Sequence, residues 1–365
     1  MDVKRKRVLF LLPSMRGGGS ERVISIIVNH LDRSVFEPVL VLLQKEGIYL
    51  NDLPKDLKIV DLKVTKARYA IGKIVKTIQM LEPDIVMSTL GHINILLALL
   101  KPLLPKKTKY IARESSIVSI NNQQTRYPAL FDFLYKRVFN NFHGIIAQSQ
   151  FMKQDLVENY GVNAEKIRTI YNPLDIAKIE QLSQEECNCF NSSKFNILIV
   201  GRLSNEKNHK AIFHIMKLLP KEYHLTVLGD GILKEELLEL SQTLELQEQV
   251  SFIGFDKNPY KYMKQADVVV SMSFYEGFPN VLIEATACTT PIVAYNGKGG
   301  TAEIIENGVN GYLIPFGDEQ AFCRTLEKMK EHNLEEQSIK ERALQYEVSK
   351  IIQQYEKTFL DTLGK

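Results

Sequence analysis

The sequence predicts an α/β fold with two Rossmann-like domains that face each other across a cleft. The chain has 365 residues, which is too long for one ordinary core and fits two domains of roughly 150 to 200 residues. In each half, short apolar runs alternate with segments of helical periodicity, which is the pattern of βαβ units and a parallel sheet. A polar stretch without apolar periodicity, residues 182–194, lies between the two patterns and indicates a linker or a surface excursion.

The elements of the first half follow one another in the order that such a domain requires. We expect strands at residues 8–12, 38–43, 59–61, 85–88, 109–112 and 144–148, and helices at 20–31 and 71–81. A further apolar run covers residues 93–100. The second half restarts at residue 195, with expected strands at residues 195–201, 225–229, 250–253, 268–272, 291–294 and 311–314.

The C-terminal segment, residues 335–363, is charged and has the period of a helix, so it is expected to form a closing helix pair. Its apolar stripe consists of Ile351, Ile352, Tyr355, Phe359 and Leu363. The predicted organisation is an N-terminal domain over residues 1–175, a C-terminal domain over residues 176–345 and a closing helix over residues 346–365.

Composition excludes several classes of protein. Charged residues make up 24% and apolar residues 45%, as in a soluble globular protein, and a net charge of +3 is too small to indicate a nucleic-acid partner. The longest apolar stretch, residues 93–104, is interrupted by Lys101 and Pro102 and is shorter than the ~20 residues that span a bilayer. The basic residues 4–7 precede an apolar run too short for a signal peptide, which favours a cytoplasmic protein.

Neither a metal nor a cofactor is expected. The four cysteines, Cys187, Cys189, Cys288 and Cys323, contain no Cys-x-x-Cys pair and have no histidine cluster nearby, so we interpret them as free thiols in a reducing compartment. The chain also contains no Asp-x-Asp sequence that would hold a divalent ion.

Two glutamates eight positions apart, Glu276 and Glu284, frame a segment that runs from a strand through a Gly/Pro turn into a helix. Backbone N–H groups at such a helix start favour anionic ligands, and carboxylates placed there bind hydroxyls or cations. The pattern therefore predicts a ligand that carries both anions and hydroxyls, such as a nucleotide sugar. A glycosidase pair is the weaker interpretation, because a hydrolase needs no diphosphate clamp.

Three loops after predicted strands could contact the same ligand. Gly17, Gly18 and Gly19 open the first helix and would let backbone amides approach phosphate, although a plain tight turn explains them equally well. In the loop 201–208, Arg202 and Lys207 could neutralise a diphosphate, whereas alone they would be ordinary exposed basic residues. Gly229 belongs to a Gly-Asp-Gly turn that either approaches the ligand or simply turns the chain.

Taken together, these residues resemble family 4 glycosyltransferases, which are retaining enzymes with two Rossmann-like domains of the GT-B type. The resemblance covers nearly the whole chain and rests on the order of five motifs: Gly18-Gly19-x-Glu21-Arg22, the loop 201–208, Gly229-Asp-Gly, Glu276-x7-Glu284 and Asn307-Gly-x-Asn-Gly311. It implies that residues 1–175 bind the acceptor, that residues 176–345 bind the nucleotide sugar, and that the C-terminal helix packs back toward the N-terminal domain.

The resemblance also implies roles for individual positions. Arg202 and Lys207 would hold the donor diphosphate, Glu284 the ribose hydroxyls, and Glu276 would lie beside the donor sugar. The helix-start segment Gly277, Phe278, Pro279 and Asn280 would contact sugar and phosphate through the backbone amides available there. The turn at Gly18 and Gly19 would close over the phosphates.

Two departures from the family pattern leave positions open. Many members have a histidine after a central N-domain strand, where this chain has Arg113 and Glu114, and either of these could contact the sugar or the acceptor hydroxyl. His92, after another strand, is the alternative, although a lone histidine at a strand end is more often structural. Thr289 replaces a usual glycine, which we expect to change a turn and not the chemistry.

By this resemblance the function is transfer of a hexose or N-acetylhexosamine from a nucleotide sugar, UDP-linked in preference to GDP-linked, with retention and without a metal. The expected acceptor is a glycan or a sugar on a polyprenyl diphosphate. The alternatives are a hydrolysing nucleotide-sugar epimerase and a noncatalytic nucleotide-sugar-binding subunit.

The N-terminal half also has an excess of basic residues interleaved with apolar ones. Such a surface suits the anionic inner leaflet of a plasma membrane, to which the protein would bind peripherally. The alternative is that these residues are ordinary solvent-exposed helix faces. The basic residues are Lys4, Arg5, Lys6, Arg7, Lys63, Lys66, Arg68, Lys73, Lys76, Lys101, Lys106, Lys107 and Lys109, and the apolar ones are Tyr69, Ile71, Ile74, Leu103 and Leu104.

Overall fold

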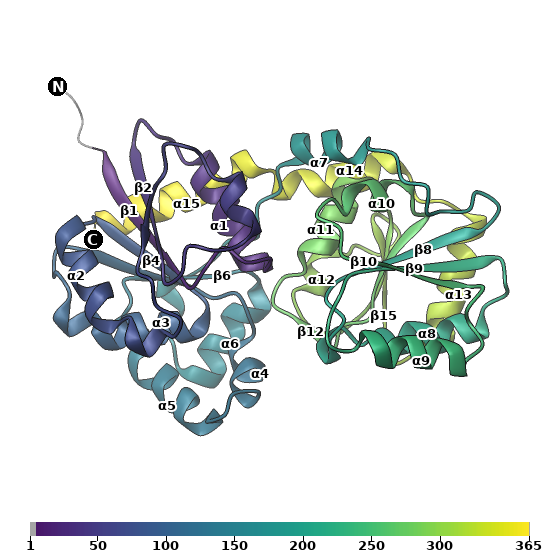
Figure 1. The fold of residues 1–365 in the computed structure, drawn as a ribbon, viewed down its shortest axis with the longest axis horizontal. Coiled ribbons are helices and arrows are strands. Elements are labelled where there is room, and N and C mark those ends of the chain that lie inside the picture. Colours follow the sequence, from purple (N-terminus) through teal and green to yellow (C-terminus); the bar gives the residue numbers. More distant parts are fainter. Residues whose placement is uncertain (1–4, 365) are drawn as a thin grey trace. The chain divides into compact units, whose positions relative to one another are not determined.

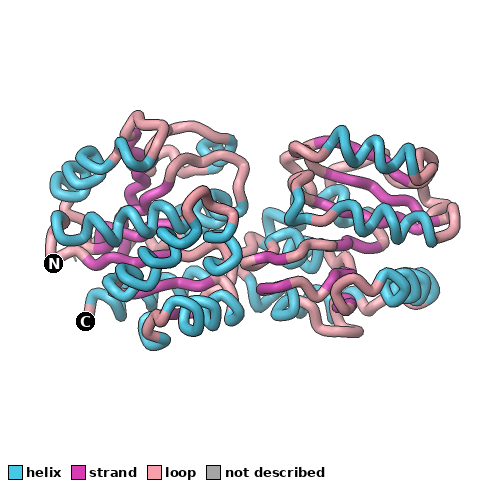
Figure 2. The backbone as a smooth tube through the Cα atoms, turned by 90° about the horizontal axis from the view of Figure 1, so that it is seen from below, coloured by secondary structure: helices cyan, strands magenta, loops and turns pink. Residues whose placement is uncertain are grey.

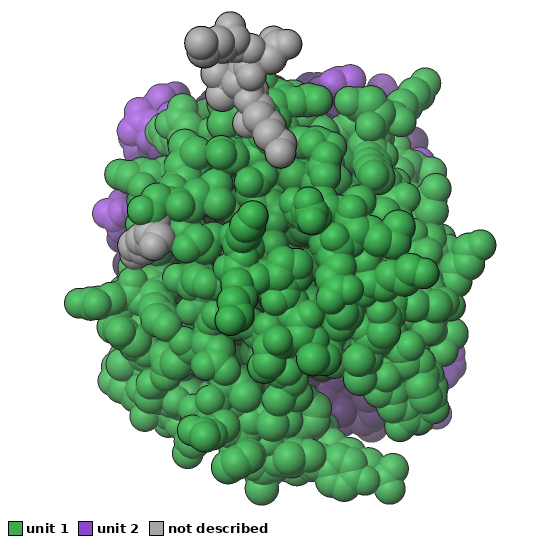
Figure 3. Space-filling model, turned by 90° about the vertical axis from the view of Figure 1, so that its left-hand side faces the viewer, with its two compact units in different colours: residues 1–173, 348–365 green, residues 174–347 purple. Residues whose placement is uncertain are grey.

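A computed structural model describes residues 5–364 of the chain, so Lys4 of the basic N-terminal run lies outside the described residues. The chain forms two compact units (Figure 3). Unit 1 contains residues 1–173 and 348–365, and unit 2 contains residues 174–347. Each unit is an α/β domain in which strands lie between helices (Figure 2), which confirms the predicted fold class.

Unit 1 is built on a seven-stranded parallel sheet with the order β3-β2-β1-β4-β5-β6-β7. Four of these strands, β1, β2, β4 and β6, are labelled in Figure 1. Its strands are β1 (Lys6–Leu12), β2 (Phe36–Leu42), β3 (Lys58–Asp61), β4 (Ile85–Thr89), β5 (Lys109–Arg113), β6 (Gly144–Ala147) and β7 (Ile167–Thr169). Its helices are α1 (Gly19–His30), α2 (Ile71–Leu81), α3 (Gly91–Leu100), α4 (Val118–Gln123), α5 (Pro128–Val138), α6 (Gln150–Tyr160) and α15 (Val348–Leu363).

The strands of unit 1 are apolar because helices cover both faces of a parallel sheet. Residues 8–12 of β1 are at most 1% exposed. On one face, α15 packs with α1 over the central strands, and the ring of Phe359 makes edge contacts with Phe10 and Phe36 at centroid distances of 6.4 and 5.9 Å. The C-terminal helix therefore packs back onto the N-terminal sheet, as predicted.

Unit 2 has a six-stranded parallel sheet with the order β10-β9-β8-β11-β13-β15 and a separate two-stranded sheet, β12-β14. Its strands are β8 (Phe195–Val200), β9 (Tyr223–Leu228), β10 (Val250–Gly254), β11 (Val268–Ser271), β12 (Tyr275–Glu276), β13 (Ile292–Tyr295), β14 (Lys298–Gly299) and β15 (Gly311–Ile314). Its helices are α7 (Ile176–Ser183), α8 (His209–Leu218), α9 (Lys234–Thr243), α10 (Tyr260–Gln265), α11 (Asn280–Ala287), α12 (Thr301–Ile304), α13 (Glu319–Glu331) and α14 (Glu336–Ala343).

The structure of several segments could not be predicted from the sequence pattern. The apolar run 93–100 is the buried helix α3, and the polar stretch 182–194 lies inside unit 2, between the end of α7 and β8. The helices α4 to α6 were not anticipated. Two of the expected surface residues, Ile74 and Leu104, are instead 1% and 5% exposed, because they lie on the core side of their elements.

Both large sheets contain one point at which the order of the strands reverses. In unit 1 the chain builds outward from β1 to β3 and then returns to place β4 on the other side of β1, and in unit 2 it does the same at β8 and β11. Ligands of open α/β sheets bind outside the carboxyl ends of the strands at such a reversal. The fold therefore indicates one candidate site in each unit.

Candidate active site

The reversal point in unit 2 has a small pocket at the carboxyl ends of β8 and β11, which we call the β8–β11 pocket. It is lined by Ile199, Val200, Lys207, His209, Val270, Ser271, Met272, Ser273, Glu276, Pro279, Val281 and Leu282. The first residue of α8 and the residue before α11 are both among them. Because helix N-termini present unbonded amides and a positive partial charge, the pocket is suited to an anion.

The ion pair of Lys207 and Glu276 is the polar centre of this pocket. The Lys207 ammonium donates to the Glu276 carboxylate, which also accepts a hydrogen bond of 2.8 Å from the Ser273 hydroxyl. Both side chains of the pair remain partly exposed, at 26% and 16%. They are thus fixed by each other and still accessible to a ligand.

Backbone contacts hold both members of the pair in place. Glu276 lies on β12, which pairs with β14, and its carbonyl accepts a 3.0 Å bond from the amide of Gly300. The amide of Phe274 donates to the carbonyl of Glu206 at 3.0 Å, which joins the loop of Glu276 to the loop of Lys207. The two loops that carry Lys207 and Glu276 are therefore joined where they line the pocket.

Arg202 lies on the same loop as Lys207 but not in the same contact. Its side chain is exposed, and it makes no hydrogen bond or ion pair with any residue that the structure describes. The structure thus brings Lys207 and Glu276 together and leaves the guanidinium of Arg202 available for an anion.

Gly229 packs against the backbone of the loop 201–208. A Cβ atom on Gly229 would lie 1.8 Å from the carbonyl oxygen of Gly201, so no side chain fits there. The neighbouring Gly231 faces Leu203 in the same way, at 2.3 Å from its carbonyl oxygen. The Gly-Asp-Gly turn is therefore required for packing against the loop 201–208, whatever ligand it contacts.

The segment before α11 places the remaining predicted residues of unit 2. Gly277 is partly exposed, whereas Phe278 is buried and its ring packs edge-on against Tyr346 at 5.6 Å. Pro279 caps α11 and Asn280 begins it. Glu284, one turn further along, is only 2% exposed and does not line the pocket.

The reversal point in unit 1 brings Ser20 of α1 against Thr89 of β4, with their hydroxyl oxygens 3.0 Å apart. Gly18 and Gly19 immediately precede Ser20, and the backbone of Gly19 is exposed. Beneath them lies the fully buried Arg113, whose guanidinium donates to Ser20 at 3.2 Å and to Asn172 at 2.8 Å.

Arg113 also connects to the C-terminal helix, because its Nε donates to the hydroxyl of Tyr355 at 3.0 Å. The next residue, Glu114, is equally buried and accepts hydrogen bonds from Asn94 at 2.7 Å and Tyr135 at 3.1 Å. Burial raises the pKa of Glu114 to about 7, although these two hydrogen bonds lower it. Both side chains are thus placed to support the site from within the core.

His92, in contrast to Arg113 and Glu114, lies at the surface of unit 1. It is the second residue of α3 and is exposed, while its neighbour Gly91 lies so close to Tyr135 that a Cβ atom would be 2.3 Å from the phenol oxygen. Of the three open N-domain candidates, His92 alone is accessible to a ligand in the described structure.

Sequence reasoning missed four residues of these two sites. Ser273 bonds to Glu276, Asn94 and Tyr135 bond to Glu114, and His209 lines the β8–β11 pocket. Only the position of His209 at a predicted strand-to-helix loop could have indicated it. Among residues 5–364, no group of three or more His, Cys, Asp or Glu side chains is placed to hold a metal ion.

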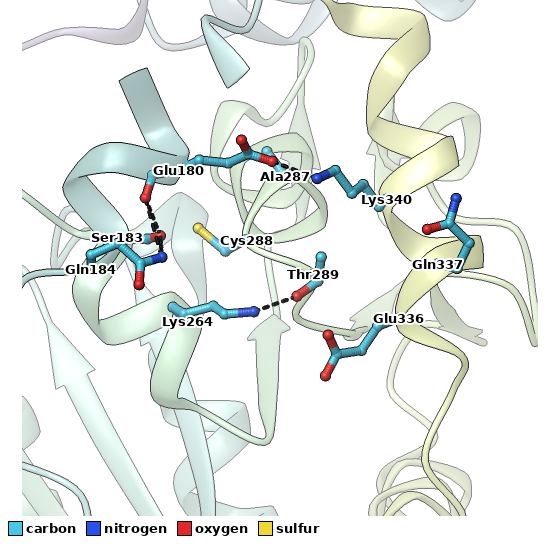
Figure 4. Close-up of a pocket in the computed structure, with 10 residues that line it drawn as sticks. All are labelled: Glu180, Ser183, Gln184, Lys264, Ala287, Cys288, Thr289, Glu336, Gln337 and Lys340. Atoms are coloured by element: carbon cyan, nitrogen blue, oxygen red, sulfur yellow. Dashed lines mark hydrogen bonds and ion pairs between the residues drawn. The ribbon is translucent and has the colours of Figure 1, made fainter. Parts of the chain in front are cut away.

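A second pocket in unit 2, of about 410 Å³, lies at the other end of α11 (Figure 4). Lys264 donates to Thr289 there at 2.8 Å, and Lys340 pairs with Glu180 at 2.7 Å. None of the predicted site residues lines it, and it is remote from the carboxyl ends of the strands.

Two α/β domains with parallel sheets, and a pocket with a lysine–glutamate pair at a strand reversal, are the arrangement found in glycosyltransferases of the GT-B type. The family model described as Glycosyltransferase Family 4 matches residues 17–178, and the model described as Glycosyl transferases group 1 matches residues 183–346. The chain therefore belongs to the family 4 (group 1) glycosyltransferases, which confirms the resemblance.

Individual relatives agree with this assignment. The chain is 30% identical over 339 residues, 90% of its length and 92% of the relative's, to N-acetylgalactosamine-N,N'-diacetylbacillosaminyl-diphospho-undecaprenol 4-alpha-N-acetylgalactosaminyltransferase of Campylobacter jejuni. It is 27% identical to the amylovoran biosynthesis glycosyltransferase AmsD of Erwinia amylovora, over 88% of this chain and 90% of that one.

A solved structure, that of Anabaena HepE in complex with UDP-glucose, has the same fold. It superposes with a TM-score of 0.80 at 22% identity and covers 97% of this chain and 99% of that one.

Proposed function

We propose that this glycosyltransferase transfers a hexose or N-acetylhexosamine from a UDP-sugar to a glycan carried on a polyprenyl diphosphate. Two relatives from Campylobacter jejuni support the sugar and the carrier, because their names describe N-acetylgalactosamine transfer to undecaprenol-linked diphosphate glycans. The solved complex of HepE with UDP-glucose supports UDP as the nucleotide.

The observation that carries the proposal is the position of Lys207 and Glu276. They meet at the strand reversal of unit 2, beside the N-termini of α8 and α11. A departing nucleoside diphosphate needs positive charge that is already in place, and a sugar needs an acceptor for its hydroxyls. Lys207 supplies the first and Glu276 the second.

The reaction breaks the bond between the anomeric carbon and the diphosphate and forms a bond from the same face to an acceptor hydroxyl. In the retaining course that we propose, the departing phosphate oxygen accepts the proton of that hydroxyl. Lys207, Arg202 and the N–H groups of Gly277, Phe278 and Asn280 stabilise the charge on the leaving group, so we propose transfer without a metal.

The other predicted residues take supporting roles in this proposal. Glu284 binds the ribose hydroxyls, and the exposed turn at Gly18 and Gly19 contacts phosphate. His92 is the N-domain side chain that contacts sugar or acceptor, whereas the buried Arg113 and Glu114 hold the strand ends beneath it.

We also propose that unit 1 binds the anionic membrane that carries the acceptor. Within residues 5–364, no helix is long and apolar enough to cross a bilayer. The α2–103 face, defined here as the exposed side of residues 66–80 and 103–107, carries Arg68, Tyr69, Ile71, Lys76, Met80, Leu103, Lys106 and Lys107. The Gln79 side chain donates to the carbonyl of Leu103 at 3.3 Å, so the two segments adjoin. Mixed basic and apolar surface suits an anionic leaflet.

The test is incubation of the purified protein with a panel of UDP- and GDP-sugars and an undecaprenyl-diphosphate-linked glycan, with the products identified by mass spectrometry. We expect one UDP-sugar to extend the glycan, with the α-linkage retained, and EDTA to leave the rate unchanged. Release of free sugar without acceptor would instead support an epimerase. Donor binding without any product would support a noncatalytic subunit.

A further inference from the structure

His209 is a buried histidine whose ring has no partner in the described structure. It is the first residue of α8, directly after Lys207 and Asn208, and its side chain is 2% exposed. Neither Nδ1 nor Nε2 has a hydrogen-bond partner among the described residues. Buried polar groups are almost always bonded, because leaving one unpaired costs stability.

Two half-buried histidines elsewhere in the described structure do have hydrogen-bond partners. His143 accepts a bond from the amide of Tyr110 at 2.9 Å, and His224 bonds to the Ser251 hydroxyl at 3.0 Å. His209 differs from them in its position, since it lines the β8–β11 pocket together with Lys207 and Glu276.

The environment keeps the ring of His209 neutral. Burial, and then the charge of Lys207, lower its pKa to about 4. The positive end of α8 acts in the same direction. At neutral pH the ring therefore has one N–H donor and one acceptor nitrogen, and adds no charge to the pocket.

We propose that the His209 ring donates a hydrogen bond to an oxygen of the donor's diphosphate. This inference rests on the proposed function, because it takes the β8–β11 pocket as the diphosphate site. Lys207 then supplies the charge, and His209 supplies the direction that a flexible ammonium lacks. An unbonded ring in the ligand-free enzyme is the expected arrangement for a donor that is reserved for the ligand.

The first experiment measures binding of inorganic pyrophosphate and of UDP by calorimetry. In His209→Leu we expect the Kd for both to rise about 10- to 100-fold, as for loss of one hydrogen bond to a charged group. His209→Gln, which keeps an N–H donor, should recover most of the affinity. His214→Leu, on the exposed side of the same helix, should bind both as the unchanged protein does.

Thermal unfolding of the ligand-free variants separates this role from a structural one. Because the ring has no partner to lose, His209→Leu should unfold at the same or a higher temperature than the unchanged protein. A destabilised His209→Leu with unaltered pyrophosphate affinity would overturn the inference.

The second experiment needs no variant that could misfold. With ¹⁵N-histidine protein, pyrophosphate should shift the ring resonances of His209 and leave those of His214 in place. If Lys207→Ala loses pyrophosphate binding but the His209 resonances never move, the inference fails and the donor site stands. If the unchanged protein binds neither pyrophosphate nor UDP, both the donor site and the inference fail.

Discussion

At the scale of single residues, the site consists of side chains that lie far apart in the sequence and meet in the fold. Lys207 and Glu276 are 69 positions apart and form an ion pair, and both follow central strands. The sequence could place each of them on a loop after a strand, because the strands are apolar and the loops contain glycine or proline. It could not show that the two loops adjoin, since that depends on the order of strands in the sheet.

Arg113 and Glu114 show a second limit of sequence reasoning. Arginine and glutamate are rarely buried without partners, so their sequence position suggested surface residues that touch substrate. Their partners, among them Asn94, Tyr135 and Tyr355, come from three other helices. Only the assembled structure shows that the guanidinium of Arg113 and one carboxylate oxygen of Glu114 find partners within the core.

Lys207→Ala should lower turnover about a hundredfold or more while the fold is retained, because it removes one preorganised positive charge from the leaving group. Arg202→Ala should have an effect of similar size if its free guanidinium binds the same diphosphate. Turnover with the best UDP-sugar is the measurement, and circular dichroism checks the fold. Near-normal rates in both variants would contradict the proposed clamp.

Glu114→Gln should change how stability depends on pH. The folded chain holds the Glu114 proton up to pH about 7, against an ordinary pKa of 4.5, so between these values it binds more protons than the unfolded chain. Its contribution to the free energy of unfolding therefore falls as pH rises through this range. Relative to the unchanged protein, Glu114→Gln should gain about 3 kcal/mol from pH 4.5 to pH 7, as measured by urea unfolding.

Comparing the two proteins at each pH cancels the contribution of His143, whose pKa is lowered to about 4 by burial and which acts in the opposite direction. A difference between the variant and the unchanged protein that stays constant with pH would show that Glu114 is ionised in the folded chain.

At the scale of elements, long periodic segments were predictable and short ones were not. The apolar stripe of α15 identified its buried face, and Ile351, Ile352, Tyr355 and Phe359 are all at most 4% exposed. By contrast α4 has six residues and α5 carries exposed Leu130 and Phe133, so neither shows a clear amphipathic period.

Phe359→Ala should test the attachment of α15 to the sheet of unit 1. The ring is fully buried against Phe10 and Phe36, and such a deletion typically costs about 3–5 kcal/mol of unfolding free energy. The neighbouring Leu360 is 47% exposed, so Leu360→Ala should stay within about 0.5 kcal/mol. Equal losses in the two variants, measured by guanidinium unfolding, would contradict the observed packing.

Thr289→Gly should stabilise the end of α11. Thr289 has φ of +60°, a left-handed conformation that costs a β-branched residue about 1–2 kcal/mol and glycine almost nothing. After the larger unfolded-state entropy of glycine is subtracted, we expect a gain of about 0.5–1 kcal/mol, seen as a higher melting temperature. Thr289→Ala, which also removes the bond from Lys264 but keeps a Cβ atom, is the matched control and should show no such gain.

At the scale of the whole molecule, fold class and family were predictable because they rest on repetition and motif order. The donor sugar and the acceptor were not, since they depend on surfaces that no motif defines. The membrane proposal depends in the same way on which basic residues share a face. Gly229 illustrates the general point, because its motif was evident and its packing role against Gly201 was not.

Replacing Lys106 and Lys107 by glutamate, which reverses their charge, should weaken membrane binding. Each basic residue near an anionic leaflet contributes about 1 kcal/mol, so loss of the two should lower the partition onto phosphatidylglycerol-containing vesicles at least about 30-fold. Lys217→Glu with Lys221→Glu in unit 2 is the charge-matched control. Equal binding of both double variants, or equal binding to neutral phosphatidylcholine vesicles, would contradict the α2–103 face as the membrane surface.

The interruption of unit 1 by unit 2 has a consequence for biosynthesis. Residues 174–347 form unit 2, and the ends of this insertion meet where the amide of Leu174 donates to the carbonyl of Tyr346 at 2.8 Å. The sheet of unit 1 precedes unit 2 in the chain, whereas α15, which covers Phe10 and Phe36, follows unit 2. We therefore expect the packing of unit 1 to be completed only after unit 2 has been synthesised.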